Sequence, residues 1–216
     1  MDNVVVSLSG GKDSTYALYE ALKEGLNVQH LLFINTGGKG HLANKWVVKL
    51  VSEAVGIPAV MVNTDLPAIR KALKKLQADV IVSGVMTTPE HMEWYQELCG
   101  PIQVKHYAPL WGKEPLAALE EMLQAGFHML VIEVDTALGS NREWLGKEID
   151  AKMISELKAL KSKQEINPIG EWGEYHTIVL DGPIYKKRIN VLKMEIKWEK
   201  TKGYVTIKKA DLQPKA

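Results

Sequence analysis

The stretch that decides the fold is Val4-Val5-Val6-Ser7-Leu8-Ser9-Gly10-Gly11-Lys12-Asp13-Ser14. Its start is almost continuously apolar, which is typical of a strand buried on both faces of a parallel sheet. Gly10 and Gly11 permit a tight turn close to a ligand, and Asp13 and Ser14 favour the start of a helix. The following apolar residues recur at helical spacing, and Gly25 ends the pattern. The stretch therefore predicts a strand, a glycine loop and a helix N-terminus.

Such a junction suits a phosphate group, because the first N–H groups of a helix lack partners and carry the positive end of its dipole. Lys12 adds a full positive charge. A Walker A loop is excluded, since Val6 stands where that loop has Gly and Asp13 follows the lysine in place of Ser or Thr. The dinucleotide pattern G-x-G-x-x-G is also absent. The alternative is a glycine-rich turn with a solvated lysine.

The residues from Ser9 to Ser14 resemble the Ser-Gly-Gly-Lys-Asp-Ser signature of the PP-loop ATP pyrophosphatases. This resemblance implies a Rossmann-like, adenine-nucleotide α-hydrolase-like fold and cleavage of ATP between its α- and β-phosphates. It implies catalytic roles for Lys12 and Asp13, Mg²⁺ at Asp13, and a lysine that faces the ligand rather than the core. The residues implied to bind ATP here are Ser9, Gly10, Gly11, Lys12, Asp13 and Ser14.

Length and composition set the class of protein. The 216 residues, 46% of them hydrophobic, suffice for one large domain or two small ones. No apolar stretch approaches the roughly 20 residues of a membrane span, and a strand begins too early for a signal peptide, so we expect a cytoplasmic location. The single cysteine, Cys99, excludes an intrachain disulfide, a multi-cysteine metal site and sulfur insertion by paired cysteines.

Positive charge gathers at the end of the chain, although the formal net charge is only +1. The segment 184–216 holds ten Lys and Arg against three Asp and Glu. Such a segment fits RNA or an acidic protein, but its lysines also alternate with apolar residues as on the wet face of a hairpin. We favour the solvated face and expect no nucleic-acid partner.

Strand and helix patterns alternate along the first part of the chain. We expect further strands at 28–34, 59–62, 80–82 and 103–107, and helices at 42–55, 66–76 and 89–99. This alternation predicts an α/β fold, with a five-stranded parallel sheet and helices on both faces. From 127 the pattern changes to a strand at 127–134, a helix at 149–160 and antiparallel strands at the end. We therefore expect an ATP-binding domain at 1–126 and a smaller α+β domain at 127–216.

Two further places lie at the carboxyl ends of expected strands, where open α/β sheets bind ligands. Lys39 and His41 belong to the loop 35–41, which contacts nucleotide or substrate or is simply an exposed polar loop. Ser83 and Gly84 are expected to lie close to the nucleotide, or else Gly84 only opens the next loop.

A second motif covers 167–177, Asn-Pro-Ile-Gly-Glu-Trp-Gly-Glu-Tyr-His-Thr, with carboxylates at Glu171 and Glu174. With Asp181-Gly182-Pro183 and the PP-loop, it resembles the diphthine–ammonia ligase family, which carries Gly-Glu-Gly-Gly-Glu-Tyr/Phe-Glu-Thr followed by Val-Leu-Asp-Gly-Pro. The resemblance covers nearly the whole chain in motif order. It implies that ATP activates the carboxylate of diphthine, a modified histidine of elongation factor 2, and that ammonia then displaces AMP.

In that resemblance Glu171 and Glu174 are implied to be catalytic, holding an ammonium ion, Mg²⁺ or the acceptor. The alternative is that both carboxylates cap nearby backbone N–H groups. The chain departs from the family at Trp172 in place of Gly, at His176 in place of Glu, and at 86–95, which lacks the usual Gln and Arg. These departures leave the ATP half intact and the acceptor half altered. The chain is therefore expected to act on diphthine or, as a divergent paralogue, to amidate a different acceptor.

Two other functions remain open. One is a PP-loop enzyme that modifies RNA, and the other is a non-catalytic module that binds an adenine nucleotide. Tryptophans in expected loops permit a homodimer, and the ammonia source is left open.

Overall fold

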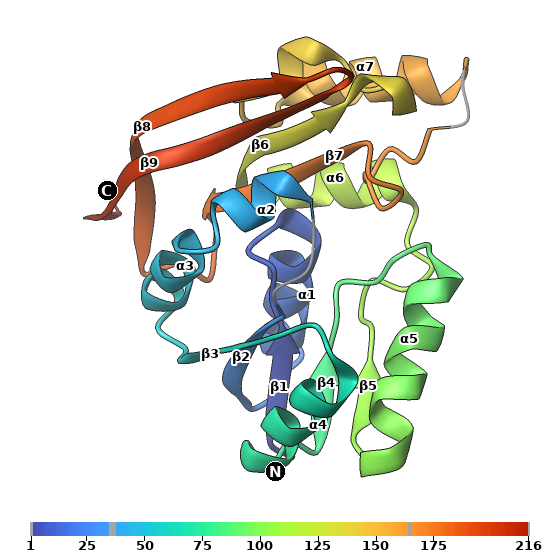
Figure 1. Ribbon diagram of the computed structural model, residues 1–216, viewed down its shortest axis with the longest axis vertical. Helices are drawn as coiled ribbons and strands as arrows, with labels where there is room; N and C mark the ends of the chain where they lie inside the picture. Colours follow the sequence, from blue (N-terminus) through green and yellow to red (C-terminus); the bar gives the residue numbers. More distant parts are fainter. Residues whose placement is uncertain (1, 35–37, 164–165, 216) are drawn as a thin grey trace.

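The structure is a computed structural model that describes residues 2–34, 38–163 and 166–215. It consists of an N-terminal α/β half with a parallel sheet and a C-terminal half with an antiparallel sheet. The first sheet has five strands, all parallel, in the order β3-β2-β1-β4-β5. Their bounds are β1 (Val4–Ser7), β2 (Val28–Ile34), β3 (Ala59–Val62), β4 (Val80–Val82) and β5 (Lys105–Tyr107). The predicted α/β fold with a five-stranded parallel sheet is confirmed (Figure 1).

Helices cover both faces of this sheet. One apolar cluster includes residues of α1 (Lys12–Lys23), α3 (Val47–Val55) and α6 (Pro115–Gln124), and the other includes residues of α4 (Leu66–Lys75) and α5 (Pro89–Cys99). Val4 and Val6 belong to the first cluster and Val5 to the second. Because successive strand residues point to opposite faces, a strand buried on both sides needs the unbroken apolar run seen in the sequence.

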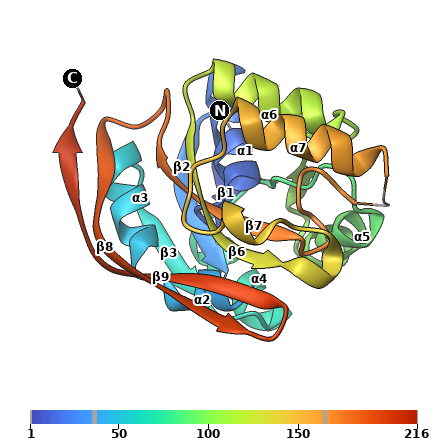
Figure 2. The same ribbon diagram turned by 90° about the horizontal axis from the view of Figure 1, so that it is seen from above.

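The second sheet is antiparallel, in the order β7-β6-β9-β8. Its strands are β6 (His128–Asp135), β7 (Tyr175–Asp181), β8 (Lys187–Glu199) and β9 (Lys202–Pro214). β6 and β9 pair over only three residues of each, Glu133–Asp135 and Lys202–Tyr204. The β8–β9 hairpin therefore leaves the β6–β7 pair and curves past α2 and α3 (Figure 2).

The remaining elements are short connections and one further helix. They are α2 (Lys39–Ala43), α7 (Ala151–Lys161) and the 3₁₀ turns η1 (Gly100–Ile102), η2 (Thr136–Leu138) and η3 (Arg142–Trp144). α6 and α7 contact each other beside the second sheet (Figure 2). Among the helices that the structure describes, none is both long and apolar enough to span a bilayer.

The single helix expected at 42–55 is wrong, because the structure has two helices with a break at Asn44. The Asn44 amide donates to Gly40 O at 2.7 Å and to Val205 O at 2.8 Å, and its oxygen accepts from Ile207 N at 2.7 Å. These bonds fasten α2 to β9. Asn44 is 1% exposed, so its side chain satisfies its polar groups on β9 rather than in water.

The expected hairpin is present but longer, and its apolar side is covered along β9, at Val205 and Ile207, but only partly along β8. Leu192, Met194 and Ile196 alternate with charged residues on β8 as predicted, yet they are 49%, 39% and 48% exposed. The division at 126/127 stays a prediction. One apolar cluster contains buried residues from both parts of the chain, from Val4 in the first strand to Ile207 in the last.

Candidate functional site

The PP-loop lies where β1 meets α1, and β7 of the C-terminal sheet crosses it. Gly10 has φ +81°, a left-handed conformation that favours glycine, and Gly11 is the N-cap of α1. Val179 N donates to Gly10 O at 2.9 Å, and Lys12 N donates to the Thr177 hydroxyl at 3.0 Å. The C-terminal half is therefore bonded directly to the loop that the sequence predicts to bind phosphate.

The N–H groups of this loop divide into two sets. Gly11 N donates to the Ser9 hydroxyl at 3.2 Å and Lys12 N to Thr177, so these two N–H groups already have partners inside the protein. Among residues 2–34, 38–163 and 166–215, no other residue accepts a hydrogen bond from the N–H of Asp13 or of Ser14, although the Asp13 N–H lies against its own carboxylate. Two donors that no other residue uses, at the positive end of a 12-residue helix, fit an anion such as phosphate.

The side chain of Lys12 is buried, at 2% exposure. Its ammonium donates to Ile169 O at 2.5 Å and to Asp13 Oδ2 at 3.0 Å, and lies 4.9 Å from the centre of the Tyr175 ring. Lys12 is thus held by the core of the protein, which was not expected, and its contact with the ligand stays a prediction. Its charge is instead matched by a carbonyl and a carboxylate in a site with little water.

Asp13 has one oxygen to spare. Oδ2 accepts from Lys12, while Oδ1 is buried and has no hydrogen-bond partner in the part of the chain that the structure describes. Burial raises the pKa of this carboxyl, and the adjacent Lys12 charge opposes that rise. An unpaired carboxylate oxygen fits Mg²⁺. The described residues contain no group of three or more His, Cys, Asp or Glu suited to a metal, so phosphate oxygens and water would complete its coordination.

Glu171 is fully engaged by the loop that follows β4. Its carboxylate accepts from Met86 N at 2.8 Å and Thr87 N at 2.7 Å, from the Thr87 hydroxyl, and from the Thr88 hydroxyl at 3.1 Å. Thr88 is the N-cap residue of α5, but no hydrogen bond from its side chain caps that helix. These contacts hold two distant loops together and leave no carboxylate oxygen without a donor.

Glu174 holds its own loop closed and is 1% exposed. It accepts from Asn167 N at 2.8 Å and from Trp172 N at 3.0 Å. Burial raises the pKa of this carboxyl, and the backbone donors oppose the rise. Both carboxylates of the motif thus cap backbone N–H groups, the alternative that the sequence left open, and their catalytic roles stay predictions.

Ser83 and Gly84 lie beside the PP-loop. The Ser83 hydroxyl is bonded to His106 Nε2 at 2.7 Å, while a Cβ on Gly84 would lie 2.6 Å from the backbone of Asp13. Gly84 therefore allows the end of β4 to touch the start of α1. Contact of either residue with the nucleotide stays a prediction.

His41 joins the site and Lys39 does not. The ring of His41 lies 5.2 Å from that of His176, centre to centre, and close to Gly11. Burial lowers the pKa of His41 to about 3 and that of His176 to about 4, so both imidazoles are neutral at neutral pH. Lys39 instead pairs with Glu199 on β8. Positions 35–37 of the predicted loop lie outside the described residues.

Two residues at the site were not predicted from the sequence. Thr177 accepts from the PP-loop, and Glu133 on β6 is 6% exposed and accepts from Gly40 N at 2.8 Å. A signal existed for Glu133, because a carboxylate inside an apolar strand must find a donor. Thr177 ends the second motif, but only the fold brings it to Lys12, 165 residues away.

Comparison with known families supports one assignment. The model of the diphthamide synthase N-terminal domain matches residues 2–106, and that of the diphthamide synthase C-terminal domain matches residues 114–212. The chain belongs to the diphthamide synthase family. Within this family assignment, the PP-loop falls in the N-terminal match and the motif 167–177 in the C-terminal one.

The curated relatives that are similar to this chain share the name diphthine–ammonia ligase. A diphthine–ammonia ligase of Danio rerio is 28% identical over 222 residues, which cover 86% of this chain and 85% of that protein. The Homo sapiens diphthine–ammonia ligase is 26% identical, over 89% of this chain and 84% of that protein. The diphthine–ammonia ligase of Schizosaccharomyces pombe is 28% identical over 88% of this chain, but the match spans only 36% of its own length.

Proposed function

We propose that this chain is an ATP-dependent amide-forming ligase that acts on diphthine of elongation factor 2, with ammonia as the nitrogen donor. The observation that carries the proposal is the match of both halves to diphthamide synthase domains, in a fold that presents the N–H groups of Asp13 and Ser14 at the PP-loop. The shared name of the relatives supports the same activity.

The chemistry proposed for the site has two steps. The N–H groups of Asp13 and Ser14 bind the phosphates that leave, and the Lys12 charge offsets the negative charge that builds up on them. A carboxylate oxygen of the acceptor bonds to the α-phosphorus of ATP, and pyrophosphate leaves. The ammonia nitrogen then bonds to the acyl carbon, AMP leaves with the bonding electron pair, and one proton is released. Mg²⁺ at Asp13 would neutralise phosphate charge.

The two neutral imidazoles distinguish the acceptor side of this site. His176 stands where the resemblance places a glutamate, and it faces His41 at 5.2 Å. Replacing a carboxylate by a neutral ring removes one negative charge close to the PP-loop, because His176 faces His41 and His41 lies beside Gly11. We propose that the acceptor carboxylate meets less repulsion here than beside a glutamate.

The function is tested by incubating the protein with ATP, Mg²⁺, ammonia and purified elongation factor 2 that carries diphthine. We expect AMP and pyrophosphate only when the factor is present, together with amidation of the factor measured by mass spectrometry. Release of ADP and phosphate would contradict the proposal. Tight ATP binding without turnover would favour the nucleotide-binding module, and turnover with RNA would favour the RNA-modifying enzyme.

Substitution of Lys12 tests the site. Lys12→Ala should abolish pyrophosphate release and also lower the free energy of unfolding by about 1–3 kcal/mol, because the Ile169 carbonyl and the Asp13 carboxylate lose a buried donor. Both effects are measured on one preparation, by pyrophosphate assay and urea unfolding. Lys12→Arg keeps the charge and serves as the control for stability. Unchanged turnover in Lys12→Ala would remove the PP-loop assignment.

A further inference from the structure

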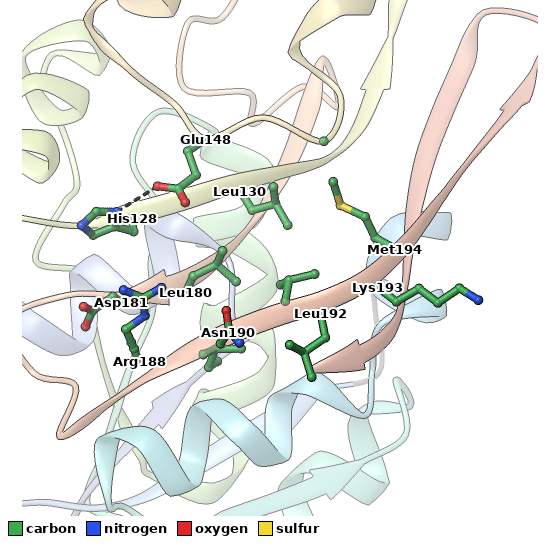
Figure 3. Close-up of a pocket in the computed structure, with 13 residues that line it drawn as sticks. His128, Leu130, Glu148, Leu180, Asp181, Arg188, Asn190, Leu192, Lys193 and Met194 are labelled. Atoms are coloured by element: carbon green, nitrogen blue, oxygen red, sulfur yellow. Dashed lines mark hydrogen bonds and ion pairs between the residues drawn. The ribbon is translucent and has the colours of Figure 1, made fainter. Parts of the chain in front are cut away.

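A cavity of about 670 Å³ lies between β6, β7 and β8, apart from the PP-loop and the motif 167–177 (Figure 3). It forms because β6 and β9 pair over so few residues, so that the start of β8 diverges from β6. The edge of β6 here pairs with another segment instead, through the bridge of Leu130 with Glu148. The result is a concave part of the second sheet that none of the described residues fills.

The surface of the cavity is partly apolar. Leu130 and Leu180 come from β6 and β7, and Leu192 and Met194 come from β8 (Figure 3). Leu192 and Met194 are 49% and 39% exposed, and Ile196 continues the same side of the strand at 48%. Three neighbouring large apolar side chains exposed on one strand mark an interaction surface rather than scattered surface residues.

The charges around the cavity are not balanced. Of its carboxylates, Asp181 pairs with Lys215 at 2.9 Å, and Glu148 accepts a hydrogen bond from His128 at 2.9 Å, which balances its charge only when that ring is protonated. Arg188 and Lys193 also line the cavity, with the Lys193 side chain extending outward at its edge (Figure 3), and the described part of the chain offers neither of them an ion-pair partner. The cavity and its edge therefore combine apolar side chains with two positive charges that have no ion-pair partner among the described residues.

We propose that this cavity docks an acidic segment with apolar side chains on the protein acceptor. A second copy of this chain fits less well, since the hairpin 187–214 carries eight Lys and Arg against three Asp and Glu and would repel its own copy. Nucleic acid fits less well too, because a phosphate backbone gains nothing from Leu192 and Met194. Arg with apolar anchors in a concave surface is the composition of a protein-binding site.

The inference rests on the proposed function for the identity of the partner, but its test does not require turnover. The probe is purified elongation factor 2 that carries diphthine, and the measurement is its dissociation constant by calorimetry. The variant Arg188→Glu with Lys193→Glu should raise that constant by about tenfold, because two attractive charges become repulsive. Where the protein is active, the KM for the factor should rise likewise, with the KM for ATP unchanged.

The matched control is Lys197→Glu with Lys200→Glu, which makes the same change in net charge on the same hairpin but outside the lining of the cavity. It should bind the factor like the wild type. Equal weakening by both variants would show non-specific attraction and overturn the proposal, as would no weakening by either. If the wild type binds the factor without amidating it, the proposed function fails and the docking site stands. Binding of RNA that only the first variant loses would assign the cavity to RNA.

Discussion

At the scale of single residues, Glu171 has the contacts of a positioning residue. It accepts two backbone N–H groups and two hydroxyl groups from 86–88, and every one of these donors needs an oxygen. Glu171→Gln would place an NH₂ group against some of them. We expect unfolding to be easier by about 1–3 kcal/mol and amide exchange to be faster at Met86 and Thr87.

A purely catalytic Glu171 would behave differently. Its replacement by Gln would reduce the rate of amidation while the exchange of the Met86 and Thr87 amides stayed slow. Hydrogen exchange measured beside turnover separates the two roles. Thr88→Ala removes only one of the four contacts, at 3.1 Å, and is the milder control.

At the same scale, the two neutral histidines lead us to predict how the stability of the protein depends on pH. Burial lowers the pKa of His41 to about 3 and that of His176 to about 4, whereas both rings take up a proton near pH 6.5 once the chain unfolds. The unfolded state therefore binds more protons below pH 6.5, and stability falls as pH falls from about 6.5 to about 4. The slope is on the order of 1 kcal/mol per pH unit for each histidine.

The pH prediction is checked by urea unfolding between pH 4 and pH 8. His41→Gln with His176→Gln should show a shallower loss than the wild type. Asp13 and Glu174, whose pKa values burial raises, act in the opposite direction and are the same in both proteins. His106, with a pKa lowered to about 4, also remains in both. Equal slopes would show that these two rings are not neutral in the folded protein.

At the scale of elements, β7 supports the PP-loop through Thr177. Its hydroxyl accepts from Lys12 N at 3.0 Å, directly before the donors of Asp13 and Ser14 in the chain. Thr177→Val keeps the shape but removes the acceptor. We expect pyrophosphate release to fall about fivefold, which corresponds to one hydrogen bond of about 1 kcal/mol.

The control for that prediction is Thr177→Ser, which keeps the hydroxyl. It should retain near-normal pyrophosphate release, measured under the same conditions. Two equally impaired variants would point to the methyl group of Thr177 and against the hydrogen bond. Two fully active variants would mean that β7 does not help to order the PP-loop.

Elements were predictable from the sequence where the signal is local. The strand, glycine loop and helix around Gly10 and Gly11 are specified within a few residues, and so are the parallel strands. The break at Asn44 was not, because its partners Val205 and Ile207 lie 161 and 163 residues away. The site follows the same rule. The PP-loop was visible in sequence, whereas the partners of Glu171 and of Lys12 depend on the fold.

At the scale of the whole molecule, the two parts of the chain share one apolar core. Residues of β1 and α1 belong to the same cluster as residues of β6, β7 and β9. The backbone bond from Val179 to Gly10 and two of the bonds of Asn44, with Val205 and Ile207, cross the boundary between these parts. Apolar burial contributes about 25 cal/mol per Å², so separating the parts exposes surface that neither can cover alone.

We therefore predict that the intact chain unfolds in a single cooperative transition, although it is divided by sequence pattern into 1–126 and 127–216. Expressed alone, the segment 1–126 should bind a hydrophobic dye and show poorly dispersed amide signals in NMR spectra, because the cluster of Val4 and Val6 loses its cover. Mixing it with 127–216 should restore dispersion if the two pieces associate. Two separate calorimetric transitions, or a well-ordered isolated segment 1–126, would contradict this prediction. Either result would show that the ATP-binding part is an autonomous domain and that its contact with β7 does not stabilise it.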